Sequence, residues 1–112
     1  MKAVFKPILF IVLLITIIST SGTGQQPLKS RMIVLSDIEA DPDDSQTLIR
    51  LLLYSNQIDI EGLIATTSVH QKARVAPETL RKIINGYEKV QPNLLKHEPG
   101  YPAAQTLLAV VK

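Results

Sequence analysis

The sequence predicts an α/β fold with an open, mostly parallel sheet, of which this chain supplies the first βαβα portion. Two short apolar runs rich in β-branched residues alternate with segments of helical periodicity, and this alternation is typical of βαβ units. A parallel sheet needs helices on both faces, which two strands and three helices cannot provide. We therefore expect the 112 residues to be the amino-terminal part of a larger domain.

The first 24 residues have the pattern of a secretory signal peptide. Lys2 and Lys6 precede an apolar run over residues 8–18, and residues 19–24 are small and polar. The run is shorter than the ~20 apolar residues that cross a bilayer. We predict a signal peptide at 1–24, a linker at 25–31 and the domain fragment at 32–112. An uncleaved anchor or a buried core helix are the alternatives.

This prediction places the mature protein outside the bacterial cytoplasm, secreted or periplasmic, with membrane contact only during export. Without Lys2 and Lys6, ten basic residues face ten acidic ones. Such a neutral chain lacks the basic stripe of a nucleic-acid-binding protein. It also has no cysteine, so an exported form must be stabilised by its core or by a metal ion rather than by disulfides.

The mature elements follow from periodicity and from turn residues. Residues 32–35 form a buried strand, and a helix begins at Pro42 after Asp41 as N-cap and ends near Tyr54. A second strand covers 58–65, and a second helix runs from 77 to about 90 with an amphipathic stripe. Residues 91–102 contain three prolines and a glycine and are expected to be a loop. A third helix covers 103–111, with no strand after it.

Five of the ten acids lie within eight residues between the first strand and the first helix. This acidic corner comprises Asp37, Glu39, Asp41, Asp43 and Asp44, at the strand end where open α/β sheets bind ligands. Clustered carboxylates repel one another, and oxygen ligands suit calcium or magnesium. A solvated loop is the alternative, because a helix dipole stabilises first-turn acids by roughly 0.3–1 kcal/mol each. That alternative leaves Asp37 and Glu39 unexplained.

The acidic corner resembles a known signature. Asp37, Glu39, Asp43 and Asp44 match the D-x-D-x-x-x-D-D pattern of nucleoside hydrolases, with glutamate in the second place. The segments 54–56, 60–68, 81–87, 92–97 and 99–102 are similar to the nucleoside-hydrolase-like domain of a bacterial family labelled cellulose-binding. The resemblance covers 32–112 and implies a Rossmann-like, nucleoside-hydrolase-like fold.

The resemblance also implies a mechanism. Nucleoside hydrolases bind one calcium ion, which holds a water molecule and two ribose hydroxyls. By position, Glu39 is the calcium ligand and catalytic base, Asp44 a bidentate calcium ligand, and Asp43 a substrate-hydroxyl acceptor. Asp37 is a supporting acid, assigned both to the metal site and to catalysis. Thr67 lies near the position at which nucleoside hydrolases have a substrate-binding asparagine.

Three functions remain open at this point. The first is hydrolysis of a glycosyl (N-glycosyl) bond by a calcium-bound water, with a small glycoside as substrate. The second is carbohydrate (cellulose) binding without turnover, and the third is a truncated product without function. No nucleic-acid partner is expected. His70 is expected to be an ordinary surface histidine, and His97 is assigned no chemistry.

Overall fold

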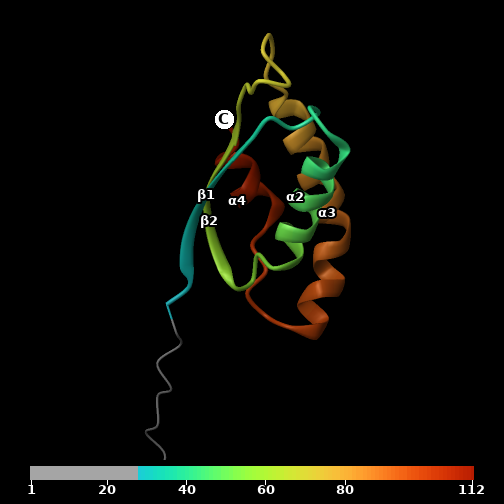
Figure 1. Ribbon diagram of the computed structural model, residues 1–112. Helices are drawn as coiled ribbons and strands as arrows, with labels where there is room; N and C mark the ends of the chain where they lie inside the picture. The colour runs from blue at the N-terminus through green and yellow to red at the C-terminus, as the bar shows by residue number, and fades with distance from the viewer. Residues whose placement is uncertain (1–27) are drawn as a thin grey trace, which may run out of the picture.

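Strands and helices alternate along residues 28–112, which are the residues that the computed structural model describes (Figure 1). The predicted signal peptide and residues 25–27 of the predicted linker lie outside them. The elements in chain order are β1 (Ser30–Ser36), α2 (Pro42–Leu53), β2 (Ile58–Ala65), α3 (Pro77–His97) and α4 (Ala104–Ala109). β1 therefore begins two residues before the strand that the sequence predicts.

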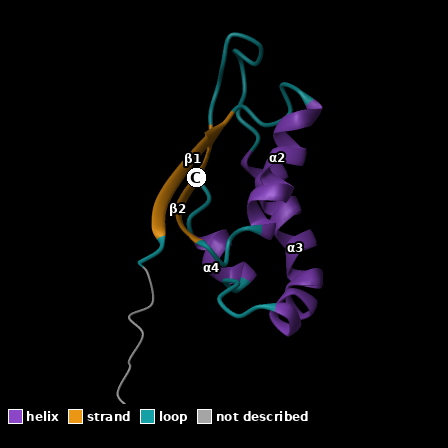
Figure 2. Ribbon diagram, turned by 60° about the horizontal axis from the view of Figure 1, so that its bottom comes forward, coloured by secondary structure: helices purple, strands orange, loops and turns teal. Residues whose placement is uncertain are grey.

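The two strands are parallel and are joined by α2, as the βαβ pattern predicts. Their register runs from Ser30 opposite Ile58 to Ser36 opposite Ala65. Both views show α2 and α3 together on one side of the sheet (Figures 1 and 2). The α/β fold class with a parallel sheet is confirmed. Asp41 is the N-cap of α2 and Pro42 its first residue, although the Asp41 side chain makes no capping hydrogen bond.

The core fills the space between this face of the sheet and the helices. Its most deeply buried side chains come from every layer and are 0–2% exposed: Ile38, Leu52, Leu63, Ile84 and Leu107. Burial of one such side chain stabilises a fold by about 1.5–3 kcal/mol. Because Ile38 belongs to the acidic segment itself, the core anchors the candidate site directly.

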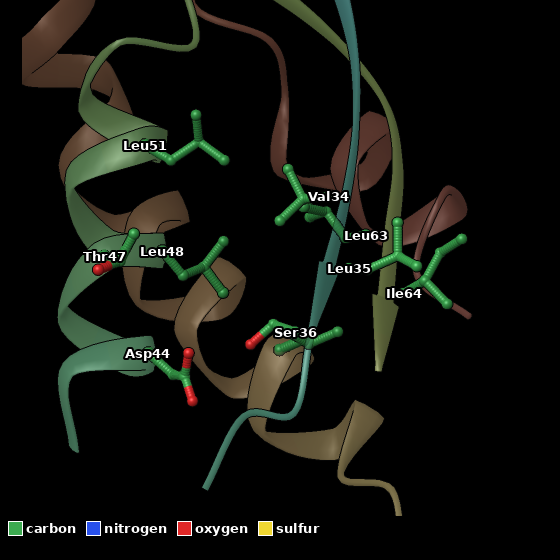
Figure 3. A pocket seen from close by; sticks show the side chains of 10 residues that line it. Val34, Leu35, Ser36, Asp44, Thr47, Leu48, Leu51, Leu63 and Ile64 are labelled. Carbon is green, nitrogen blue, oxygen red and sulfur yellow. The ribbon is translucent and has the colours of Figure 1, made fainter. Parts of the chain in front are cut away.

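Within residues 28–112, no helix covers the opposite face of the sheet. Side chains alternate along a strand, so Val34 faces the helices whereas Ile33 and Leu35 face outward and are 58% and 64% exposed. In the close view of Figure 3, Leu35 and Ile64 lie on the far side of the strands from α2. This bare face agrees with the expectation that two strands and three helices leave a parallel sheet half covered.

A β-bulge interrupts the pairing of the strands at Glu61. Met32 pairs with Ile60 and Ile33 with Gly62, so Glu61 is the extra residue. Its carboxylate accepts hydrogen bonds from the Arg31 guanidinium across the strands, one of them from NH2 at 2.6 Å. A Cβ on Gly62 would lie 3.0 Å from Cγ2 of Ile33. A side chain at position 62 would therefore be crowded by Ile33 unless Ile33 shifted.

The prediction of a loop at 91–102 is wrong at its start, because α3 continues through Pro92 to His97. Proline removes one helical N–H and disturbs the turn before it, but Glu88, four residues earlier, is exposed and its carbonyl can be solvated. The Gln91 side chain also donates to the carbonyl oxygens of Tyr101 and Pro102, at 3.3 and 3.1 Å. These bonds tie the helix to the segment that follows.

The expectation of a third helix to Val111 with no strand after it is also wrong. α4 ends at Ala109, and Val111 forms a parallel bridge with Leu63. Leu63 N–H donates to Val110 O, and Lys112 N–H donates to Leu63 O, both at 3.0 Å. Residues 110–112 thus pair in parallel with the free edge of β2.

Within residues 28–112, no helix combines the length and the apolar character that a bilayer crossing needs.

Candidate functional site

The acidic corner lies at the carboxyl end of β1, where the chain turns into α2. The segment after β2 lies at the same end of the sheet, because Thr66 N–H donates to Ser36 O at 2.8 Å and extends the parallel pairing. Figure 1 shows this segment, residues 66–76, projecting beyond the strand ends. The site is therefore built from two crossover segments, one after each strand.

Asp44 is the acid most enclosed by the fold. In Figure 3 its carboxylate points from the first turn of α2 toward Ser36. Both residues line a cavity of about 110 Å³ between the sheet and α2, whose other walls are mainly apolar. Burial raises the pKa of the Asp44 carboxyl, and the charges of Asp37, Asp43 and Asp41 raise it further. Asp44 thus experiences the other three aspartates as close like charges.

Ser36 is the neutral partner of this carboxylate. The hydroxyl of Ser36 opposes the rise in the pKa of Asp44. Its Oγ is nevertheless buried without a hydrogen bond of ordinary length to any group in the described part of the chain. In Figure 3 the Ser36 hydroxyl and the Asp44 carboxylate face each other.

A tight turn separates Asp37 from Glu39. Ala40 N–H donates to Asp37 O at 2.9 Å, and Glu39 has a positive φ of 83°. A positive φ at the third residue is typical of a type II turn, where glycine is favoured. The two acids can face one side only if the backbone is extended, and this condition is not met.

Glu39 forms its contacts with the second crossover segment instead. Its Oε1 accepts a hydrogen bond from the Thr79 hydroxyl, and its Oε2 lies 2.6 Å from a guanidinium nitrogen of Arg74. The Thr79 hydrogen bond and then Arg74 hold the pKa of the Glu39 carboxyl below its ordinary value. The structure therefore places Asp37, Asp41 and Asp43 where their charges act on Asp44, but it directs Glu39 elsewhere.

Gln71 supports the turn and was missed by the reasoning from sequence. Its side-chain amide is buried and donates to the carbonyl oxygens of Ile38 at 3.1 Å and Asp37 at 3.5 Å. The Ser68 hydroxyl accepts from the backbone N–H groups of His70 and Gln71, at 2.9 and 3.2 Å. A single polar residue in a loop gives no periodic signal in a sequence, so only the structure identifies it.

Thr67 and His70 lie at the same edge of the sheet. Thr67 directly follows the strand pair and is exposed. His70 is exposed too, as expected for an ordinary surface histidine. Thr67 is thus open to solvent, and its role as a substrate contact stays a prediction.

The acids of the acidic corner meet one requirement of a calcium site but fail another. Their oxygen donors are of the right chemical type. Within residues 28–112, however, no three Asp, Glu, His or Cys side chains lie close enough together to hold a metal ion. Glu39 is engaged by Arg74 and Thr79. In this arrangement the residues do not fit calcium.

Comparison with known proteins identifies the family. Residues 31–112 match the family model described as cellulose-binding Sde182, nucleoside hydrolase-like domain. The chain belongs to this family. None of the curated proteins matches it.

A solved structure agrees with the Sde182 nucleoside hydrolase-like assignment. It is a nucleoside hydrolase-related hypothetical protein from Saccharophagus degradans that is associated with carbohydrate metabolism. The two are 37% identical, with a TM-score of 0.72 over 75% of this chain. This chain spans 20% of the length of that protein. The resemblance inferred from the signature acids is confirmed at the level of the family.

Proposed function

We propose that this Sde182-family chain binds a carbohydrate at the acidic corner, in a protein that is exported from the cell. The observation that carries the proposal is that three aspartates of the acidic corner have no cationic partner among the described residues. None of Asp37, Asp43 and Asp44 forms an ion pair within residues 28–112, where the paired acids are Glu39, Asp59, Glu61 and Glu78. Carboxylates without a cation are strong acceptors for sugar hydroxyl groups.

Two further features support binding over turnover. The base expected from the resemblance, Glu39, is held by a cation and a hydroxyl, and a lowered pKa makes a carboxylate a weaker base. The family description names cellulose binding, which is consistent with a neutral polyhydroxyl ligand. Thr67 adds an exposed hydroxyl at the same edge.

The test is a calorimetric titration with cellohexaose. Asp43→Asn and Asp44→Asn should each weaken binding by roughly tenfold, since a hydrogen bond to a charged group contributes about 1.5–3 kcal/mol. Asp59→Asn is the matched control, because this exposed acid lies in β2 away from the corner. Equal affinities for all four proteins would contradict the proposal.

Calcium-dependent hydrolysis of a glycosyl bond is the second candidate, and the signature acids together with the nucleoside hydrolase-like family favour it. Calcium, when bound, would make a water molecule easier to deprotonate. This candidate requires Glu39 to leave Arg74 and Thr79. It predicts that calcium causes release of free sugar from inosine, that Asp44→Ala weakens calcium binding most, and that Glu39→Gln impairs turnover more than sugar binding. Absence of free sugar at saturating calcium would exclude it.

A further inference from the structure

Two contacts fix Ile38, the second residue of the turn that carries Glu39. Ile38 is 1% exposed and lies in the core. The Gln71 amide holds the carbonyl of Ile38 at 3.1 Å. The positive φ of Glu39 then directs the chain away from the line of β1. The backbone conformation alone therefore points the side chains of Asp37 and Glu39 in different directions.

Both carboxylate oxygens of Glu39 are occupied by the segment that leads into α3. Arg74 comes from the loop before this helix and contacts Oε2 at 2.6 Å. Thr79 comes from the first turn of the helix and donates to Oε1. We call these two residues the clamp. It joins the crossover segment after β2 to the turn after β1.

The clamp separates Glu39 from the aspartates electrostatically. The charges that act on Asp44 are those of Asp37, Asp43 and Asp41. Those that act on Glu39 are the cations Arg74 and Lys82. Glu39, the second acid of the signature, thus lies beside cations, and the aspartates remain as a separate set.

We propose that Arg74 and Thr79 are positioning residues that hold Glu39 away from the aspartates of the acidic corner. These aspartates then form a poor cation site that accepts a neutral sugar. The sugar part of this statement rests on the proposed function, whereas the cation part stands on the clamp alone. Cation affinity at oxygen sites rises with the number of charged ligands. Release of Glu39 should therefore raise the low calcium affinity of the wild-type corner.

The experiment is a calorimetric titration with calcium chloride. The double variant Arg74→Met/Thr79→Val should bind calcium roughly tenfold more tightly than the wild type, because a fourth carboxylate becomes available. Arg74→Met alone should show an intermediate gain. Arg74→Lys, which keeps the cation, should behave as the wild type. Lys72→Met is the matched control, since Lys72 is an exposed cation of the same loop, and it should cause no change.

The decisive variant adds Glu39→Gln to the double variant and should abolish the gain. A gain that persists in this triple variant, or a folded double variant with unchanged calcium affinity, would overturn the proposal. If circular dichroism shows that the double variant is unfolded, Arg74→Met alone decides, and unchanged affinity there overturns the clamp. Cellohexaose titration separates the two ideas: no binding by the wild type together with a calcium gain on release refutes the proposed function and supports the clamp.

Discussion

Glu39 occupies a backbone position that favours glycine, and its side chain explains why glutamate can stand there. A non-glycine residue with positive φ is uncommon and is found preferentially at functional sites. Here the contacts with Arg74 and Thr79 offset the unfavourable backbone conformation. Reasoning from sequence could find the acids by their spacing, but it assumed an extended backbone. Nothing in the amino-acid sequence indicates that a glutamate at this position has a positive φ.

Asp44 illustrates the opposite case, an acid whose surroundings disfavour its charge. Its pKa is raised above the ordinary 3.8, mainly by burial. The protonated form is thus favoured in the folded state, so its contribution to stability is complete below the ordinary pKa and is lost as the pH rises through the raised pKa. Asp44→Asn should raise the urea midpoint at pH 7 in calcium-free buffer, and should change it little at pH 3.

The control for this prediction is Glu88→Gln, at an exposed position of α3. It should leave the midpoint unchanged at both pH values. A midpoint for Asp44→Asn at or below that of the wild type at pH 7 would show that the carboxylate is stabilised by its surroundings.

At the scale of elements, two glycines make a matched pair. Gly62 lies at the bulge, where a Cβ would press against Ile33, whereas a Cβ on Gly86 in α3 would meet no atom within 4 Å. Gly62→Ala should destabilise the fold by about 1–3 kcal/mol, the usual cost of overpacking. Gly86→Ala should stabilise it by roughly 0.5–1 kcal/mol, because alanine restricts the unfolded chain.

Urea unfolding measures both glycine variants. Ile33→Ala should restore part of the loss in the Gly62→Ala background, because it removes the opposing side chain. Equal effects of the two alanine substitutions would show that the approach of Gly62 to Ile33 does not constrain the bulge.

The sequence predicted elements well where a periodic apolar pattern was long and bounded by turn residues. β1, α2 and β2 were placed within about two residues. α3 was predicted too short because Pro92 suggested a helix end, whereas bonds from Gln91 secure the chain beyond it. The parallel bridge at Val111 was missed because its pairing with Leu63 is a long-range contact that local patterns do not encode.

At the scale of the whole molecule, residues 28–112 place their helices on one face of the sheet and leave an exposed apolar face opposite. Exposed apolar surface drives association, so we expect residues 28–112 to self-associate at micromolar concentrations through Ile33 and Leu35. Leu35→Lys together with Ile33→Thr should shift the chain to monomer in sedimentation velocity. Val90→Thr is the control, at a 44% exposed apolar position on α3, and it should leave association unchanged. If Val90→Thr instead shifts the chain to monomer, the contact lies on the helical side.

The loop between β2 and α3 carries two different attachments, and the two residues that separate them include an exposed lysine. Gln71 supports the turn through backbone carbonyls, and Arg74 grips Glu39. Lys72 lies between them. An endoproteinase specific for lysine that nicks the chain there would leave Gln71 attached to β2 and place Arg74 near a new chain end. Exposed loops are where such nicking occurs most readily. Limited digestion could therefore loosen the grip on Glu39 while the turn beneath it stays in place, without any substitution.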